Sequence, residues 1–394
     1  MKFKKKPEIF YLSYDGLLEP LGQSQILPYI IQMSSKYKFT IITLEKRELV
    51  KSKIDTSTTK SLKIKKIKWI KLNYFKKKLL FLNFVNILII NFYLLIKIIT
   101  NKNNVIFHLR SYIPFFYFLI PIFFFKINYV FDMRGFWPQE KIDRKGWSNQ
   151  SYIIKFLIFF EKIIINYAKK IICLTNESIE ILLEKYPKTN LKQFICIRTA
   201  VDQYKFVYLK KKINLSKIIF GYLGTTDGAY NLHKSVSIFL KFKKYLPQSK
   251  IHIISMDNQY KIRKILKDLK IEENDYKIIK VDHKKVNEEI NKIDLGIFYL
   301  EENLSVKASF PTKIAEFFIC NKPIICNHFN KDIGAIIDFN KGMIIGYNTN
   351  VNKKEINNLK SILLKNYNFD YCRNYALHNL TVLNMIKNIY SCYK

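Results

Sequence analysis

The sequence predicts an α/β protein built from two doubly wound domains, each with a parallel sheet. Three observations support this prediction. Short, almost continuous apolar runs recur along the chain, as is typical of strands that are buried on both faces of a parallel sheet. Segments with helical periodicity lie between these runs. The alternation forms two series, separated by a polar, lysine-rich stretch at residues 198–215.

The expected strands can be read from the apolar runs in chain order. The first series comprises residues 9–13, 39–44, 64–72, 105–109, 129–133, 170–174 and 194–197. The second series comprises residues 218–223, 250–255, 276–281, 295–300, 323–326 and 343–345. Helices lie between the strands, for example over residues 177–185, where Thr175 or Asn176 is the expected N-cap.

Composition and charge restrict the function classes. The chain has 394 residues, of which 49% are hydrophobic and 25% charged, which excludes a disordered or low-complexity protein. The net charge of +36 favours anionic partners, namely nucleic acid, an anionic membrane surface or phosphorylated substrates. The lysines are spread along the whole chain, however, and spread lysines are more typical of a solvated surface than of a nucleic-acid stripe.

The cysteines and the N-terminus bear on the compartment. The six cysteines form no CxxC pair and no Cys/His ligand spacing, so neither a disulfide framework nor a zinc site is expected, and a reducing compartment fits best. The apolar stretch near the N-terminus covers only residues 9–12, which is too short for the core of a signal peptide.

Three apolar stretches raise the question of membrane spans. Residues 79–99 carry Asn83, Asn86, Asn91 and Lys97 within one arc of a helical wheel, which indicates an amphipathic helix. Residues 112–125 contain two prolines, and residues 152–165 are again amphipathic. We interpret the three as core helices rather than spans, while a monotopic contact with an anionic lipid surface stays open.

Polar loops follow the expected strands of the first domain, where ligands of doubly wound sheets bind. Gly16 and Gly22 lie in the loop after the first strand and could bring backbone N–H groups close to an anion, although the spacing alone favours their interpretation as turn glycines. The chain has no GxGxxG and no GxxxxGK[ST], which argues against NAD binding and P-loop chemistry.

Two further strand ends of the first domain carry charged residues. His108 and Arg110 stand at the end of the fourth strand, and Asp132 and Arg134 at the end of the fifth. Two arginines at adjacent strand ends are suited to bidentate binding of phosphate or carboxylate. The histidine and the aspartate also have structural interpretations, as a core histidine and as a loop anchor.

The second domain offers another candidate anion loop and a charged helix. Residues 221–228, with Gly224 and Thr225, follow a buried strand and precede a helix. Further on, Ser309 or Thr312 is expected to cap a helix that carries Lys313 and Glu316 on one face. One interpretation is an ordinary surface ion pair between the two residues. Near a helix N-terminus, the lysine could instead bind a phosphate and the glutamate could accept hydrogen bonds from ribose hydroxyls.

Taken together, the motifs of this sequence resemble those of a known enzyme family. Segments 11–28, 131–137, 197–206 and 311–325 are similar to family-4-like bacterial glycosyltransferases (group 1), which have the GT-B fold. The last of them, Pro-Thr-Lys-Ile-Ala-Glu-Phe-Phe-Ile-Cys-Asn-Lys-Pro-Ile-Ile, matches the donor-site pattern P-x-K-x-x-E-x-x-x-x-x-x-P-V-I. Residues 373–390 resemble the family's last helix, which returns to the N-terminal domain.

The resemblance implies two Rossmann-like domains that face each other across a cleft. Residues 1–200 would form the acceptor-binding domain, 201–375 the domain that binds a nucleotide-sugar, and 376–394 a helix that crosses back. The implied reaction is sugar transfer with retention from a nucleotide-sugar to a glycan or polyprenyl-linked acceptor, in cell-surface polysaccharide synthesis. Neither a cofactor nor a metal is expected, and the chain has no D-x-D motif.

The resemblance also implies roles for individual residues. Glu316 would bind the ribose, and Lys313 with the Gly224 loop would stabilise the leaving diphosphate. The expected catalytic residues are Arg134, Lys313 and Glu316. The expected donor-binding residues are Gly22, Gly224, Thr225, Ser309, Thr312, Lys313 and Glu316. The expected acceptor-binding residues are Asp15, His108, Arg110 and Asp132.

The chain departs from the family pattern at three places. Ala308 stands where these enzymes often have a Glu, eight positions before Glu316; residues 225–229 lack the usual Arg…Lys pair; and Arg134 stands where many relatives have His. The cations at the leaving group would therefore be Arg134, Lys313 or Lys234.

The expected protein is thus a cytoplasmic enzyme, peripheral on the inner face of the cell membrane, that does not bind nucleic acid. The alternatives are a basic nucleic-acid-binding protein without enzymatic activity and an integral membrane protein. The first predicts a dense basic stripe with interleaved aromatics, and the second predicts more spans than the one ambiguous run at 79–99.

Overall fold

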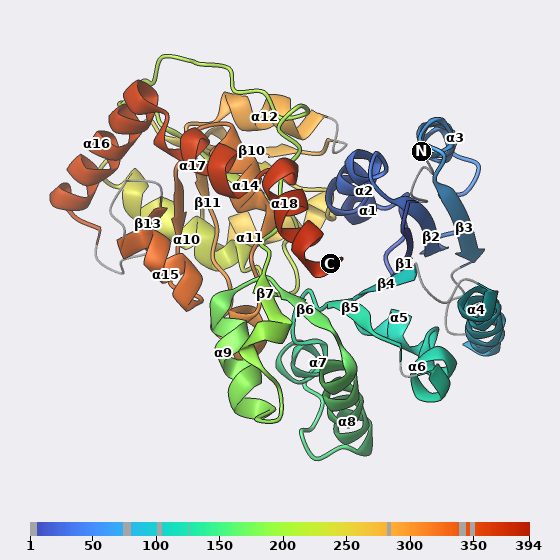
Figure 1. Ribbon diagram of the computed structural model, residues 1–394. Helices are drawn as coiled ribbons and strands as arrows, with labels where there is room; N and C mark the ends of the chain where they lie inside the picture. Colours follow the sequence, from blue (N-terminus) through green and yellow to red (C-terminus); the bar gives the residue numbers. More distant parts are fainter. Residues whose placement is uncertain are drawn as a thin grey trace. The chain divides into compact units, whose positions relative to one another are not determined.

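The computed structural model describes residues 6–73, 80–100, 105–125, 127–281, 285–338, 344–346 and 351–394. The chain divides into two compact units. The first unit comprises Met1–Arg198 with Met385–Lys394, and the second comprises Thr199–Asn384. Each unit is an α/β structure with its own parallel sheet (Figure 1).

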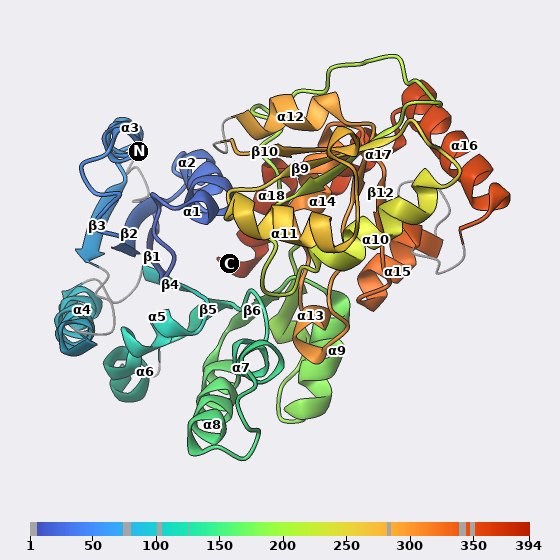
Figure 2. The ribbon, with the colours of Figure 1, turned by 180° about the vertical axis from the view of Figure 1, so that it is seen from behind.

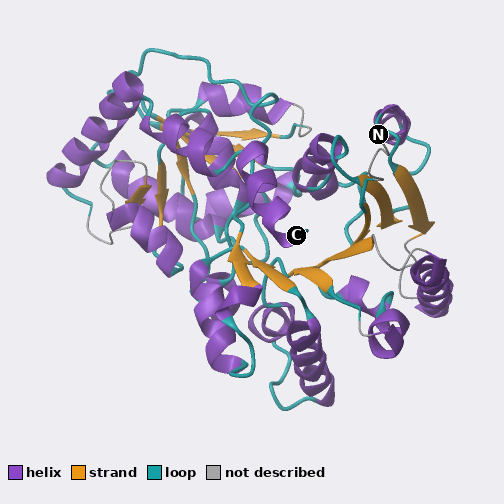
Figure 3. Cartoon of the chain, viewed as in Figure 1, coloured by secondary structure: helices purple, strands orange, loops and turns teal. Residues whose placement is uncertain are grey.

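In the described part of the first unit, the sheet has seven parallel strands in the order β3-β2-β1-β4-β5-β6-β7. The strands are β1 Glu8–Ser13, β2 Lys38–Glu45, β3 Lys68–Asn73, β4 Val105–Arg110, β5 Tyr129–Asp132, β6 Lys170–Cys173 and β7 Phe194–Cys196. Strands β1 and β5 are almost entirely buried, because helices cover both faces of the sheet (Figure 3).

The helices of the first unit connect these strands. They are α1 Pro20–Gln25, α2 Leu27–Met33, α3 Lys53–Ile64, α4 Leu80–Thr100, α5 Ile113–Phe116, α6 Leu119–Phe125, α7 Trp137–Lys145, α8 Tyr152–Tyr167, α9 Asn176–Lys185 and the short η2 Leu191–Gln193. Figures 1 and 2 show α4, α6 and α8 on one face of the sheet and α1 and α2 on the other. Among the helices that the structure describes, none combines the length and the apolar character needed to cross a membrane.

The second unit has six parallel strands within its described residues, in the order β10-β9-β8-β11-β12-β13. They are β8 Ile219–Leu223, β9 Lys250–Ile254, β10 Tyr276–Ile279, β11 Leu295–Ile297, β12 Ile324–Cys326 and β13 Ile344–Gly346. The helices are α10 Leu232–Lys243, α11 Gln259–Asp268, η3 Glu273–Asp275, α12 Val286–Lys292, α13 Leu304–Lys307, α14 Thr312–Ile319, α15 Lys331–Asp338, α16 Lys353–Phe369 and α17 Tyr371–Asn379. Helix α18, Val382–Cys392, begins in the second unit and ends in the first.

Several expectations can be compared with these elements. Thr175 caps α9 as predicted, since its hydroxyl accepts a hydrogen bond from the Ser178 amide at 3.1 Å. The expected strand 64–72 was wrong in its first part, because α3 continues to Ile64 and β3 begins only at Lys68. Residues 112–125 form two short helices, and the start of the stretches 79–99 and 343–345 lies outside the described residues.

Candidate functional site

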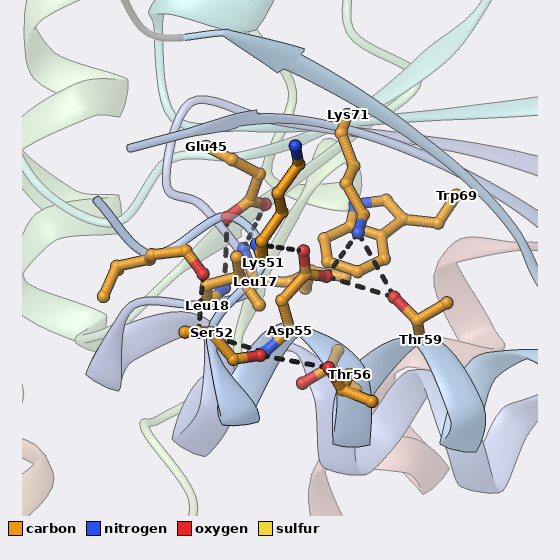
Figure 4. Close-up of polar contacts among 12 residues, drawn as sticks. Leu17, Leu18, Glu45, Lys51, Ser52, Asp55, Thr56, Thr59, Trp69 and Lys71 are labelled. Carbon is orange, nitrogen blue, oxygen red and sulfur yellow. Dashed lines mark hydrogen bonds and ion pairs between the residues drawn. The ribbon is translucent and has the colours of Figure 1, made fainter. Parts of the chain in front are cut away.

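The loop after β1 is tightly built around two glycines. A Cβ on Gly22 would lie 2.1 Å from the Gly16 carbonyl oxygen, so only glycine fits there. The carboxylate of Glu45, at the end of β2, accepts hydrogen bonds from the amides of Leu17 at 2.7 Å and Leu18 at 3.2 Å (Figure 4). A buried carboxylate therefore holds the loop against the sheet, an anchor that sequence analysis missed.

Charged residues from two strand ends meet around Asp132 at the end of β5. Arg110 Nη1 lies 3.2 Å from Asp132 Oδ2, and Arg134 Nε lies 2.8 Å from Oδ1. The Nε2 atom of His108 lies 3.5 Å from Oδ2. Burial alone would raise the pKa of Asp132, but Arg134, the His108 hydrogen bond and Arg110 together hold it well below its ordinary value. Asp132 is therefore ionised and serves as the centre of this cluster.

Arg110 is held inside the first unit. Only 1% of it is exposed, and its Nε lies 3.6 Å from Asp15 Oδ2 in addition to the contact with Asp132. Burial would lower the pKa of Arg110, but Tyr11, Asp132 and Asp15 raise it above its ordinary value. Arg110 is thus a fully charged, doubly paired cation, while the half-exposed Asp15 is the member of the cluster that a ligand can reach.

Arg134 differs from Arg110 in backbone and in surroundings. Its φ of +62° lies in the left-handed region, which costs a residue with a Cβ roughly 1–3 kcal/mol and often marks functional positions. Its Nη1 is buried and has no hydrogen-bond partner in the described part of the chain. The guanidinium therefore keeps an unused donor, although Asp132 fixes its Nε.

His108 is a buried neutral side chain. Burial lowers its pKa, an effect that Asp132 partly offsets. Its Nδ1 lies 2.8 Å from the hydroxyl of Tyr393, near the C-terminus of the chain. The structure thus brings Asp15, His108, Arg110, Asp132 and Arg134 together in the first unit.

In the second unit, the loop after β8 carries Gly224 and Thr225. Gly224 has a φ of +110°, which side chains rarely adopt. The carboxylate of Asp257 accepts hydrogen bonds from the amide and the hydroxyl of Thr226, and the Thr225 carbonyl accepts one from the Tyr222 hydroxyl. These contacts fix the loop and leave the Thr225 side chain exposed.

The loop before α14 is fixed by contacts within the second unit. The Thr199 hydroxyl donates to the Phe310 carbonyl at 2.9 Å, and the Asn330 amide donates to the Ser309 carbonyl at 2.8 Å. The expected cap was wrong: Pro311 occupies the N-cap position without a side-chain hydrogen bond, and Thr312 is the first helical residue. Proline is suited to a helix start because its ring presets φ and its missing N–H needs no partner.

Lys313, in the first turn of α14, lies in an aromatic box. Its Nζ lies 3.5 Å from the ring centre of Tyr230, 5.0 Å from that of Tyr222 and 5.2 Å from that of Phe298. Only 5% of the residue is exposed, and Nζ has no hydrogen-bond partner in the described part of the chain. Burial lowers the pKa of Lys313 to about 7, which the nearby charge of Glu316 partly offsets.

Lys313 also lies against the Gly224 loop, since a Cβ on Gly224 would come within 3.2 Å of Nζ. Glu316 lies on the same helix, almost fully buried. Sequence analysis therefore found the helix and the loop but missed the three rings. They stand in different segments, and only the tyrosine within the Gly221–Gly228 motif gave a local signal.

No protein-family model matches the sequence, and no curated protein matches it either. Solved structures do match over the whole chain. Sucrose-phosphate synthase from Thermosynechococcus elongatus has a TM-score of 0.67 at 13% identity, with 98% of each chain covered. HepE from Anabaena in complex with UDP-glucose has a TM-score of 0.63 at 12% identity, again with 98% of each chain covered. WaaG, a glycosyltransferase involved in lipopolysaccharide biosynthesis, has a TM-score of 0.61 at 12% identity, also with 98% of each chain covered.

At these identities the comparisons show the fold. The prediction of a GT-B chain with two Rossmann-like, doubly wound units is confirmed by its similarity to these structures and by the two parallel sheets.

Proposed function

We propose that this chain is a glycosyltransferase that takes a sugar from a nucleotide-sugar donor held by its second unit. The observation that carries the proposal is the position of Lys313, a buried amine beside the Gly224 loop that has no hydrogen-bond partner among the residues that the structure describes. A departing nucleoside diphosphate requires such a donor at its developing charge. The fold supports the proposal, because one of the structures with this fold holds UDP-glucose.

The donor contacts follow from the second unit. Lys313 and the backbone of Gly224 and Thr225 bind the diphosphate, and Glu316 binds the ribose hydroxyls. Thr312, the first residue of α14, and Ser309, three residues before it, are partly exposed and add hydroxyl contacts. For Gly22, in the first unit, the close approach of the Gly16 carbonyl oxygen gives the glycine a role in the shape of its own loop. The proposal assigns the leaving-group charge to side chains rather than to a metal ion.

The acceptor is assigned to the first unit. Within the Asp132 cluster, Asp15 is the accessible carboxylate and Arg134 keeps an unused N–H, so these two contact the acceptor or the transferred sugar. His108, Arg110 and Asp132 are 0–1% exposed and position them. We infer a glycan or polyprenyl-linked acceptor of cell-surface polysaccharide synthesis, and transfer with retention.

We also propose that the first unit contacts the inner, cytoplasmic face of an anionic membrane. The support is the set of exposed apolar side chains on α4, α6 and α8. These three helices lie on one face of the sheet (Figures 1 and 2). Its large exposed side chains are Leu88, Ile89, Phe92, Ile96, Ile99, Phe124, Phe125, Ile153, Phe156 and Phe159. Lysines on the same helices, such as Lys97 and Lys155, suit anionic headgroups.

The donor is identified by thermal shift with a panel of UDP-, GDP-, ADP- and CMP-sugars. A bound donor stabilises the folded chain by mass action, by about 2.7 kcal/mol at a concentration a hundred times Kd. A single-stranded oligonucleotide is the control for the alternative of nucleic-acid binding. Stabilisation by the oligonucleotide and by none of the nucleotide-sugars would refute the proposal.

Turnover then tests the donor residues. Glu316→Ala removes an acceptor that is used in both ground and transition states, so it should mainly raise KM. Lys313→Ala removes charge that matters most as the leaving group departs, so kcat should fall roughly 10²-fold. Lys365→Ala, an exposed lysine on α16, is the matched control and should keep wild-type kinetics. Wild-type turnover by both donor-site variants would place the donor elsewhere.

A further inference from the structure

We propose that binding of a nucleotide-sugar diphosphate to the second unit takes up one proton from solvent, and that Lys313 is the residue that receives it. The inference rests on the proposed donor site and adds its coupling to pH. Lys313 would be an amine in much of the empty protein and an ammonium in the complex. The N–H bond formed on Nζ is balanced by the proton that leaves the buffer.

The geometry favours an uncharged amine when no anion is bound. The three rings around Nζ offer π-faces, which attract a cation, but an ammonium has three N–H donors and the box gives them no acceptor. A buried charge without hydrogen bonds is costly, and neutralisation relieves that cost. The start of α14, with its positive end of the helix dipole, adds to the cost of a cation at this position.

Among the described residues, the charged groups around the box provide no counter-ion within hydrogen-bond distance of Nζ. On its own helix, Glu316 raises the pKa of Lys313 and only partly offsets burial. On the β8 side, Asp257 binds Thr226, and Asp227 pairs with Lys261. On the α10 side, Glu301 pairs with Lys234 and accepts from Asn231. Tyr222 has its pKa raised by burial and remains neutral.

An arriving diphosphate reverses this balance. It brings acceptors and negative charge to Nζ and to the first turn of α14, both of which favour the ammonium form. The pKa of Lys313, about 7 in the empty unit, then rises towards its ordinary value. Below about pH 6 the amine is already protonated and affinity should not depend on pH. Above pH 7 each unit of pH should weaken binding by up to tenfold, because a proton must be taken up.

The test is isothermal titration calorimetry of the full chain with UDP-glucose, UDP-N-acetylglucosamine, GDP-mannose and ADP-glucose. These diesters carry no phosphate that titrates near neutral pH, whereas free UDP does. Each titration is run in two buffers with very different ionisation enthalpies, such as PIPES and imidazole at pH 7. We expect uptake of about half a proton at pH 7, nearly one at pH 8.5 and almost none at pH 5.5.

Two variants assign the proton. Lys313→Met keeps the length and apolar stem of the side chain without a titrating group, so proton uptake should vanish and affinity should fall. Lys313→Arg stays charged throughout this range, so proton uptake should also vanish while an ionic contact is kept. Lys365→Ala should match the wild type, because this exposed lysine lies on α16 and is not part of the box.

A ligand-free measurement covers the case in which the variants bind too weakly. A lysine whose folded pKa lies below its unfolded value destabilises the fold at low pH, and this penalty disappears as pH rises towards 10. Lys313→Met should therefore melt at a higher temperature than the wild type at pH 6, with the difference shrinking at pH 9.

The outcomes separate the two proposals. Binding of a nucleotide-sugar without buffer dependence at pH 7 and 8.5, or proton uptake that persists in Lys313→Met, would overturn the proton coupling and leave the donor site intact. Absence of binding by every nucleotide-sugar would overturn the proposed function and this inference with it.

Discussion

Two buried cations in this chain have opposite electrostatic surroundings. Arg110 lies among Asp132 and Asp15, so its pKa is raised despite burial. Lys313 lies among aromatic rings, so burial lowers its pKa to about 7. A paired, hydrogen-bonded cation organises its surroundings, whereas an unpaired one is in a state that ligand binding can change. The residue that the fold leaves unsatisfied is therefore the better candidate for contact with a ligand.

Replacement of Glu45 should destabilise the first unit, because this residue anchors the loop after β1. Glu45→Ala leaves the Leu17 and Leu18 amides without their acceptor inside the first unit, which should lower the free energy of unfolding by roughly 2–4 kcal/mol. Chemical denaturation measures this change. Glu48→Ala, an exposed acid three residues later, is the control and should stay within about 0.5 kcal/mol of wild type. Equal stability of the two variants would show that Glu45 does not anchor the loop.

At the scale of elements, the buried strands could be predicted from the sequence, whereas the boundary between α3 and β3 could not. Strands such as β1 and β5 are buried on both faces, and that burial is visible as a continuous apolar run. The start of β3 was mispredicted because Ile64 has high strand propensity, yet it is an exposed residue in the last turn of a helix capped by Ser52. Tertiary packing of Leu62 outweighed the local preference of one residue.

In the candidate site, too, the sequence predicted local features but not the contacts that tertiary structure creates. Gly224, Lys313 and Glu316 could be singled out because glycine loops and helix starts follow strands in recognisable order. The box around Lys313 could not, since Tyr222, Tyr230 and Phe298 come from three segments that only the folded sheet brings together. Lys313, which the sequence alone would also allow as part of a surface ion pair, is therefore a buried amine without a hydrogen-bond partner among the described residues.

Helix α8 provides the prediction for the membrane contact. Phe156 and Phe159 are more than half exposed, and replacing both by Glu removes apolar area and adds repulsion from anionic lipid. Binding to phosphatidylglycerol vesicles should fall at least tenfold in a flotation assay, and wild-type binding should weaken as salt rises. Tyr260→Glu, on the exposed surface of α11 in the second unit, should bind as wild type. Equal vesicle binding by all three proteins would contradict a contact through α8.

At the scale of the whole molecule, Met385–Lys394 belong to the first unit although they follow the second unit in sequence. Tyr393 is buried; its hydroxyl meets His108, and its ring packs edge-on against Tyr37 with centroids 5.4 Å apart. Tyr390 lies against the same ring, and Lys36 lies over Tyr390. The first unit thus completes its core with residues that follow the second unit in sequence, so its stability depends on Tyr390 and Tyr393.

Substitution of Tyr393 is the corresponding prediction. Tyr393→Ala should destabilise the first unit by roughly 3–5 kcal/mol, through the lost aromatic packing and the unpaired His108 Nδ1. Tyr393→Phe keeps the ring and loses only the hydrogen bond, so it should cost about 1–2 kcal/mol. Hydrogen exchange resolves the site of the loss: protection should fall in β4 and α2 and stay at wild-type levels in β8 and β11. A uniform loss of protection over both units would instead mean that they unfold as one cooperative body, and that the final residues stabilise the whole chain rather than the unit they pack in.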